Sequence, residues 1–383
     1  MDSQQINLGI DASRCRSGGS INHIKGILAH FTPSVSSISY IHLWSYSKLL
    51  DIIPNYEWLI KHKTKFLDKN LLSQLFWQFF SLKKELKKYN CGFLFTADAS
   101  SLCTFKNQVV LSQDLLSYEQ GVTNYFGWGI SRARLFIIRI VQNNAFRAAK
   151  GVIFLTNYTS NLIQKSCGRL ANVAIIPHGF NSGFNEIDYK SRAKLTSHST
   201  IVCTYVSNTE MYKHQWVVVR AIALLRKKNY DIILNLIGGG NGQAQQILES
   251  QILKSDPLNK FVTQYDFLIQ DQIQEILTKT DIFVFASSCE TFGITLLEGM
   301  ASGLPIACSD RSSLPELLRD GGIYFDPENE NSIAKKIEVL INDPVLSERL
   351  AKRAKTISTE FSWERCSQET FSFISECIRK NRQ

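Results

Sequence analysis

The chain has 383 residues, of which 44% are hydrophobic and 20% are charged, and this composition excludes a disordered protein while suggesting two or three domains. Its 43 Lys and Arg residues exceed its 34 Asp and Glu residues, and the resulting formal charge of +9 favours an anionic partner. The nine cysteines are scattered and include no Cys-x-x-Cys pair, so neither a zinc site nor a disulfide framework is predicted, and a reducing cytosol fits best.

No targeting segment or membrane span is expected. Residues 1–5 are polar, and the apolar residues that follow are too few for a signal-peptide core. Apolar stretches such as 135–141 are interrupted by Arg or Lys, whereas a spanning helix needs about 20 apolar residues. We therefore expect a cytoplasmic protein that is either soluble or peripheral on the inner face of the cytoplasmic membrane.

Short apolar runs alternate with longer amphipathic segments, which predicts βα units and parallel sheets. The expected strands are 6–10, 93–96, 109–112 and 152–155, then 201–206, 232–237, 282–285 and 306–309. Expected helices between them include 213–227, 270–279 and 295–302. The polar stretch 177–199 separates the two sets and reads as a linker, so we predict two α/β domains.

One helical segment precedes the strand expected at 93. Its apolar residues from Leu71 to Leu86 lie at helical spacing, beside the lysines Lys83, Lys84, Lys87 and Lys88. A basic amphipathic helix of this kind either covers a sheet or lies in a membrane interface. The strand that follows favours sheet cover, and the membrane alternative stays open.

Two loops in the first half follow expected strands, where ligands bind in parallel sheets. Gly18 and Gly19 open a helix, and glycines let the backbone approach a ligand closely; the nearby Arg14 and Arg16 add positive charge. Gln113 and Asp114 follow the strand at 109–112. Asp114 is as well suited to capping a helix as to contacting a substrate.

Two loops in the second half lie in equivalent places. Lys213 follows the strand at 201–206, where it is either an ordinary solvated lysine or an anion ligand. Residues 237–242 read Ile-Gly-Gly-Gly-Asn-Gly, which is a weak dinucleotide fingerprint because the next required glycine is missing at Gln243. A tight turn that needs glycine accounts for at least part of this motif.

The most informative segment is Ser287–Pro305, which reads S-S-C-E-T-F-G-I-T-L-L-E-G-M-A-S-G-L-P after an expected strand. The helix that starts near Gly293 directs unpaired N–H groups and a positive dipole end at the strand tip, a setting suited to a diphosphate. Glu290 and Glu298 are separated by roughly 12 Å at most along a helix. The two carboxylates could hold hydroxyl-rich groups on opposite sides of a diphosphate. Alternatively, Glu290 is a capping acid before the helix and Glu298 is an exposed acid on its surface.

This segment closely resembles the signature of the family 4 (group 1) retaining glycosyltransferases of GT-B fold, with its Ser, Glu, Phe-Gly, second Glu and Gly-x-Pro elements. Pro177–Gly179 resembles that family's domain junction, and Phe361–Trp363 resembles the opening of its last helix. The resemblance implies an α/β fold with two Rossmann-like parallel-sheet domains facing across a cleft. These would be an acceptor-binding domain at 1–175 and a nucleotide-sugar-binding domain at 176–361, with a helix at 362–383 crossing back to the first domain.

The resemblance also implies roles for individual residues. Glu290 and Lys213 would be catalytic, through the donor sugar and the diphosphate respectively. The implied donor-binding residues are Gly18, Gly19, Gly239, Phe292, Gly293, Ile294, Thr295 and Glu298. Gln113 and Asp114 would bind the acceptor. Two positions depart from the family pattern, since Asn208 or Thr209 replaces an Arg and Gln113 replaces a His, and a Gln cannot titrate.

The implied activity is transfer of a hexose from GDP-mannose or a UDP-hexose, with retention, to a saccharide acceptor that is lipid-linked, in bacterial lipopolysaccharide, O-antigen or capsule synthesis. With no evident carboxylate nucleophile, a same-face route assisted by the leaving diphosphate is expected. No metal and no other cofactor are expected, and an anionic membrane surface is a candidate partner. Nucleic acid is not, because no basic stripe with stacking aromatics is visible. A GT-B nucleotide-sugar epimerase and a non-catalytic nucleotide-sugar-binding protein remain alternatives.

Overall fold

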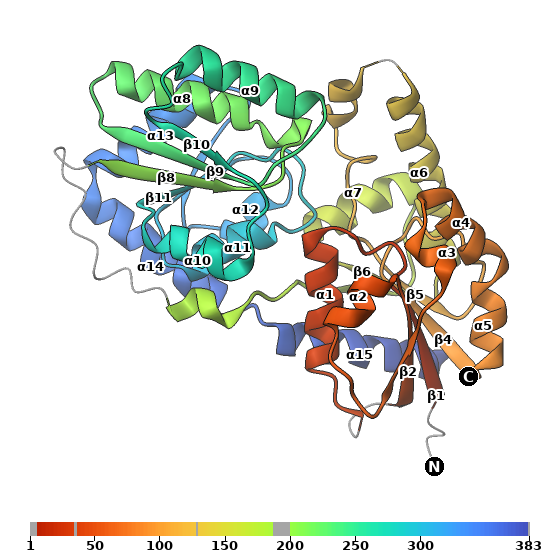
Figure 1. Cartoon of the computed structure of the whole chain (residues 1–383). Helices are drawn as coiled ribbons and strands as arrows, with labels where there is room; N and C mark the ends of the chain where they lie inside the picture. Colours follow the sequence, from red (N-terminus) through yellow and green to blue (C-terminus); the bar gives the residue numbers. More distant parts are fainter. Residues whose placement is uncertain (1–5, 34–36, 128, 187–199, 382–383) are drawn as a thin grey trace. The chain divides into compact units, whose positions relative to one another are not determined.

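The computed structural model describes residues 6–33, 37–127, 129–186 and 200–381, so part of the expected linker, 187–199, lies outside the described residues. The chain divides into two compact units, Met1–Gly179 with Ser362–Gln383, and Phe180–Phe361. Each unit is a parallel sheet flanked by helices (Figure 1). The expectation of an α/β protein with two parallel sheets is therefore confirmed. Among the described helices, none combines the length and the apolar character needed to cross a bilayer.

Unit 1 contains a seven-stranded sheet in the order β3-β2-β1-β4-β5-β6-β7. Its strands are β1 (Ile6–Asp11), β2 (Ile38–Trp44), β3 (Leu59–His62), β4 (Cys91–Thr96), β5 (Gln108–Leu111), β6 (Gly151–Phe154) and β7 (Val173–Ile175). Its helices are α1 (Gly18–Ala29), α2 (Ser47–Ile52), α3 (Lys65–Asp68), α4 (Leu71–Phe80), α5 (Leu82–Lys88), η2 (Val122–Phe126), α6 (Ile130–Ala148), α7 (Asn157–Cys167) and α15 (Trp363–Lys380).

The last helix, α15, belongs to unit 1 and packs against α1. Ser367 Oγ donates a hydrogen bond to the carbonyl of Ile27 at 2.7 Å. A Cβ at Gly26 would lie 2.3 Å from the Trp363 ring, so only glycine allows this approach of the two helices.

Unit 2 contains a six-stranded sheet in the order β10-β9-β8-β11-β12-β13. Its strands are β8 (Ile201–Val206), β9 (Ile232–Ile237), β10 (Val262–Tyr265), β11 (Ile282–Phe285), β12 (Ile306–Ser309) and β13 (Ile323–Phe325). Its helices are η3 (Ser182–Glu186), η5 (Met211–Lys213), α8 (Gln215–Lys227), α9 (Gln243–Ser255), α10 (Gln270–Thr278), α11 (Ile294–Ala301), α12 (Leu314–Leu318), α13 (Glu330–Asn342) and α14 (Pro344–Ser358).

The helix expected over residues 71–88 is two helices, α4 and α5, which meet at Ser81. α5 buries Leu82 and Leu86, and it covers the sheet as expected. α4 differs, because its buried residues are Gln74, Trp77 and Gln78, while its exposed residues include Leu71, Leu72, Phe76, Phe79 and Phe80. The expectation of sheet cover is therefore wrong for α4, since this helix does not bury its apolar face.

Candidate functional site

The strand order of unit 2 reverses between β8 and β11. From β8 the chain continues outward through β9 to β10, and from β11 it continues in the other direction through β12 to β13. At such a switch point the loops after the two central strands diverge, and the crevice between them is the usual ligand site of an open parallel sheet. Lys213 follows β8 and Glu290 follows β11, so the sheet topology brings both predicted residues to this point.

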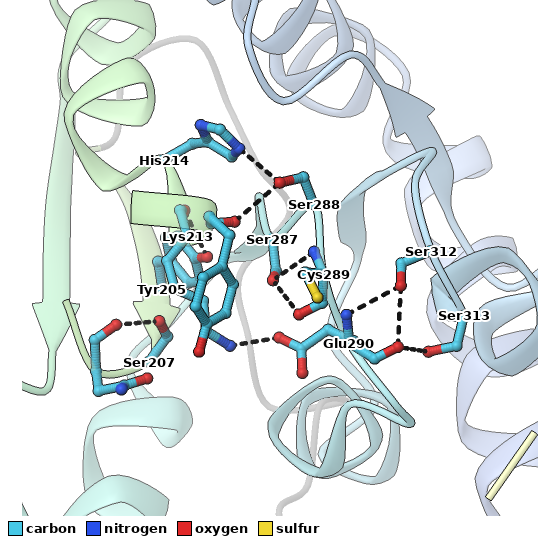
Figure 2. A network of polar contacts seen from close by, with 12 residues as sticks. Tyr205, Ser207, Lys213, His214, Ser287, Ser288, Cys289, Glu290, Ser312 and Ser313 are labelled. Carbon is cyan, nitrogen blue, oxygen red and sulfur yellow. Dashed lines mark hydrogen bonds and ion pairs between the residues drawn. The ribbon is translucent and has the colours of Figure 1, made fainter. Parts of the chain in front are cut away.

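Lys213 and Glu290 form an ion pair between Nζ and Oε1 (Figure 2). Their side chains are only 10% and 15% exposed, so the pair is largely removed from water. The backbone around Lys213 is held in place because Tyr205 Oη donates to its carbonyl at 2.8 Å. In addition, the backbone N–H of Ser288 donates to the carbonyl of Tyr212 at 2.8 Å. The two loops are thus fixed to each other by backbone and side-chain contacts, and Lys213 is not the ordinary solvated lysine of the alternative interpretation.

A third loop, after β12, fixes the backbone of Glu290. The Glu290 N–H donates to Ser312 Oγ at 3.0 Å, and the hydroxyls of Ser312 and Ser313 donate to its carbonyl at 2.9 and 2.8 Å. Figure 2 shows both serines beside Glu290. Sequence reasoning missed this support, because a Ser-Ser pair after a strand has no distinctive pattern.

His214 was also missed. Its Nε2 lies 2.8 Å from Ser288 Oγ, and its backbone has a φ of 52° in the left-handed region. Burial lowers the pKa of His214 to about 4, so the ring is neutral near pH 7. A neutral imidazole here contributes a hydrogen bond to the loop that carries Glu290, and no positive charge.

The N-terminus of α11 has the form expected from the sequence. Gly293 precedes the helix with a φ of 99°, a conformation that favours glycine, and Phe292 is buried, with its ring centroid 5.6 Å from that of Phe361. The N–H groups of the first helical turn, which includes Ile294 and Thr295, have no partner within the helix. The side chain of Phe292 therefore belongs to the core, and the backbone of this turn is what the helix offers to an anion.

Glu298 lies inside α11 and is buried, which contradicts the alternative of an exposed surface acid. Burial raises its pKa to about 8, and a hydrogen bond with Gln270 acts in the opposite direction. At neutral pH the carboxyl is mostly protonated, so it can both donate and accept hydrogen bonds.

The glycine-rich turn after β9 packs directly on the loop after β8. Gly238 has a φ of 108°, and a Cβ there would lie 2.4 Å from the carbonyl oxygen of Ser207. A Cβ at Gly240 would lie 2.7 Å from the carbonyl oxygen of Thr209, whose N–H donates to the Gly239 carbonyl at 3.0 Å. Close packing against the backbone thus explains why Gly238 and Gly240 are glycines.

In unit 1, the loop arginines are held by their own unit. Arg14 pairs with Asp98 at 3.2 Å, and Arg16 donates to the carbonyl of Leu67 at 2.6 Å. Gly18 and Gly19 are the first residues of α1, where a Cβ at Gly18 would meet nothing within 4 Å.

The two predicted acceptor residues follow β5. Asp114 does not cap a helix, because its carboxylate accepts from the N–H of Leu116 at 2.9 Å in a turn. Burial raises the pKa of Asp114 above its usual range. Gln113 Nε2 is buried and makes no hydrogen bond to the described residues, so it is an unsatisfied donor.

One group of described residues has the geometry to coordinate a metal. The ligand atoms of His23, His178 and Cys366 all lie within 4.8 Å of one another, although they are far apart in sequence. His23 Nδ1 and His178 Nδ1 are 3.1 Å apart in a hydrogen bond, and Trp363 packs against both rings. Burial lowers the pKa of His23 to about 3 and also lowers that of His178. We interpret this group as a neutral packing contact within unit 1, beside the points where the chain leaves and re-enters that unit.

Part of the chain is similar in sequence to known glycosyltransferases. Residues 188–357 match the family model of glycosyl transferases group 1. The O-antigen chain mannosyltransferase B of Escherichia coli is 26% identical over 171 residues, 44% of each chain. The D-inositol 3-phosphate glycosyltransferase of Corynebacterium kroppenstedtii is 26% identical over 212 residues, 52% of this chain and 46% of that one. The matched part thus spans about half the length of these curated relatives.

Solved structures extend the likeness to nearly the whole chain. Sucrose-phosphate synthase of Thermosynechococcus elongatus has a TM-score of 0.79 at 17% identity, covering 98% of this chain and 100% of that one. Anabaena HepE in complex with UDP and glucose has a TM-score of 0.73 at 16% identity, covering 97% and 100%. At these identities the likeness establishes the fold, which is GT-B. With the family match over residues 188–357, this likeness supports a group 1 glycosyltransferase.

Proposed function

We propose that this chain is a nucleotide-sugar-dependent hexosyltransferase, which moves a hexose from GDP-mannose or a UDP-hexose to a saccharide acceptor with retention of configuration. The observation that carries the proposal is the Lys213–Glu290 pair at the switch point of unit 2, in loops that follow the two central strands. A cation and a carboxylate fixed at this position suit a ligand that has a diphosphate beside a sugar.

The ion pair suggests how the residues act. When a donor binds, its diphosphate competes with Glu290 for the Lys213 ammonium, and the carboxylate becomes available to the sugar hydroxyls. As the glycosidic bond to the diphosphate breaks, negative charge grows on the leaving group, and Lys213 stabilises it together with the N–H groups at the start of α11. In this scheme Glu298 holds the ribose hydroxyls and Gly239 lies near the nucleotide base.

This chain has fewer ionisable residues at the proposed site than the family pattern has, because an Arg and a His of that pattern are replaced by uncharged residues. Asn208 brings no cation to the diphosphate, so Lys213 carries more of the electrostatic stabilisation. Gln113 and Asp114 would contact the acceptor, with the buried Nε2 of Gln113 donating to a hydroxyl. The leaving diphosphate itself would deprotonate the acceptor on the same face. Because Lys213 and α11 provide the positive charge, the reaction would need no metal.

The acceptor would be a lipid-linked saccharide in bacterial surface polysaccharide synthesis, with the protein acting in the cytoplasm at the membrane. This part of the proposal is supported by the similarity to a relative named as an O-antigen mannosyltransferase. Gly18 and Gly19 would contribute backbone contacts to the donor phosphates from unit 1.

The test is a turnover screen of GDP-mannose against UDP-glucose, UDP-galactose and UDP-N-acetylglucosamine, with mass detection of every product. Transfer to a saccharide acceptor, abolished by Glu290→Gln, is the expected result. Release of an altered donor without any acceptor would instead indicate an epimerase. Tight donor binding with no turnover for any donor would indicate a non-catalytic nucleotide-sugar-binding protein.

A further inference from the structure

Helix α4 packs on unit 1 through Trp77 and two polar side chains, Gln74 and Gln78. Gln78 Nε2 donates to Asp11 Oδ2 and lies equally close to Ser13 Oγ, both at 2.9 Å, and Gln74 Nε2 donates to the Lys69 carbonyl at 2.8 Å. Asp11 is the last residue of β1, and Ser101, which follows β4, also donates to it at 3.2 Å. The helix therefore lies over the carboxyl ends of β1 and β4, where strand-end polar groups require polar partners.

This packing leaves the apolar face of α4 outside. Leu72, Phe76, Phe79 and Phe80 are 51–77% exposed, and Phe66 on α3 is 45% exposed. The rings form a continuous series, with centroid distances of 6.3 Å from Phe66 to Phe76, 4.6 Å from Phe76 to Phe80 and 4.7 Å from Phe79 to Phe80. We call these five residues the aromatic patch. Single exposed apolar residues are ordinary, but a contiguous group of this size marks an interaction surface.

Helix α6 carries a second exposed apolar stripe. Ile130, Phe136, Ile137 and Ile140 are 45–89% exposed. Further along the helix, Gln142 accepts from Ser117 Oγ at 3.2 Å, just beyond the carboxyl end of β5. A crossover helix runs back antiparallel to its strands, so residues before Gln142 extend past the strand tips. The start of α6, which carries the stripe, therefore lies at the same edge of the sheet as α4, and Figure 1 shows the two helices there.

Both surfaces are bordered by positive charge. Between Lys65 and Lys88 the sequence contains six lysines and two acidic residues. Helix α6 contains four arginines and no acidic residue. A symmetric dimer through this edge would bring two positive surfaces together, which is unfavourable. An anionic bilayer, in contrast, offers both an apolar interior for the rings and negative headgroups for the cations.

We propose that unit 1 binds the surface of an anionic lipid bilayer, with the aromatic patch and the exposed stripe of α6 inserted at the headgroup boundary. Lys83 and Lys84, which directly follow α4, contact the headgroups. This binding needs neither donor nor acceptor, so it stands or fails independently of the proposed transfer reaction.

The experiment is co-sedimentation of the purified full chain with vesicles of phosphatidylcholine alone or with 30–40% phosphatidylglycerol, without any nucleotide-sugar. We expect binding to the anionic vesicles that weakens as salt is raised from roughly 50 to 500 mM. Replacing Phe76, Phe79 and Phe80 with Ser should lower the partition coefficient at least ten-fold, since each ring loses its apolar insertion. Replacing Lys83 and Lys84 with Gln should lower the partition coefficient at least ten-fold on anionic vesicles only.

A matched control replaces Leu253, Leu258 and Phe267 with Ser, since these side chains of unit 2 are even more exposed than the replaced phenylalanines. This control should bind as the wild type does, and circular dichroism should show that all variants are folded. The proposal is overturned if the wild type binds neither vesicle, or if the aromatic-patch variant binds unchanged. It is also overturned if light scattering shows a wild-type dimer that the aromatic-patch variant lacks, because a second copy would then be the partner.

Discussion

The ion pair between Lys213 and Glu290 gives the sharpest test of the site. We expect Lys213→Gln to remove the cation that faces the departing diphosphate and to leave the Glu290 carboxylate without its partner. Losing one transition-state contact of this kind should lower turnover at least 10²-fold, or about 3 kcal/mol. Glu290→Gln should have an effect of similar size, because it removes the carboxylate assigned to the sugar hydroxyls.

The same substitutions have a predictable effect on stability. Breaking a buried ion pair by removing one partner costs about 3–5 kcal/mol, and the 10% and 15% exposure of these side chains places the loss near the lower end of that range. The matched control is Lys228→Gln, whose pair with Glu338 has side chains 55% and 24% exposed. That exposed pair should contribute at most about 1 kcal/mol, and its loss should leave turnover unchanged.

The double variant Lys213→Gln/Glu290→Gln separates a structural role from a functional one. Removing both charges leaves no unpaired buried ion, so urea unfolding should show most of the lost stability regained. Turnover, measured by mass detection of the intact donor and product, should stay as low as in the single variants. Recovery of turnover along with stability would show that the pair only holds the loops together, and the catalytic assignment would then be wrong.

Further predictions concern the glycine-rich turn, metal dependence and pH. Gly238→Ala should lower the free energy of unfolding in urea by about 1–3 kcal/mol, because the φ of Gly238 is 108° and an added Cβ would collide with Ser207. Gly242→Ala is the control, since an added Cβ there meets nothing within 4 Å, and it should change stability little. Turnover should persist in excess EDTA, with any bound metal measured by elemental mass spectrometry. Complete loss of turnover that Mg²⁺ or Mn²⁺ restores would contradict the expected metal independence. Glu298→Gln should remove a fall in stability between about pH 6.5 and 8 that the wild type shows.

The sequence predicted central strands better than edge strands. In unit 2, β8, β9, β11 and β12 match their predicted ranges residue for residue, because strands buried on both faces have near-continuous apolar sequences. Of the five strands that were not predicted, β3, β7, β10 and β13 are the edges of the two sheets, and the fifth, β2, neighbours an edge. Half-exposed edges such as Val262–Tyr265 mix polar and apolar residues, so their pattern resembles a loop.

Other features depend on where distant segments meet, which no local pattern indicates. The helical spacing of Leu71 to Phe80 is the same whether the apolar face is buried or exposed, and its direction is set by Asp11, far away in sequence. The hydroxyls of Ser312 and Ser313 support Glu290 only because β12 ends beside β11. Lys213 and Glu290 could be predicted together, since both follow central strands of one sheet and the carboxyl ends of parallel strands lie at one edge.

The pH prediction follows from the environment of Glu298. Burial raises the pKa of this carboxyl to about 8, against an ordinary value of 4.5 in the unfolded chain. Between these values the folded state holds a proton that the unfolded state has released, so a rise in pH favours unfolding, by up to about 1.4 kcal/mol per pH unit. Below about pH 6.5 the buried histidines act in the opposite direction, because their lowered pKa values make stability rise with pH up to their ordinary value of 6.5.

The comparison is therefore made between pH 6.5 and 8, where the buried histidines contribute less than they do at lower pH. Over this window, the wild type should lose roughly 1.5 kcal/mol of unfolding free energy relative to Glu298→Gln, whose amide does not titrate. Taking the difference between the two proteins cancels groups that titrate equally in both, such as Asp11 and Asp114. The measurement is urea unfolding at four pH values across the window, with Glu338→Gln as the control, since the hydrogen bond with Lys228 lowers the pKa of that half-buried acid. Parallel stability curves for the wild type and Glu298→Gln would show that Glu298 is ionised throughout, and that water or a charge reaches it inside α11.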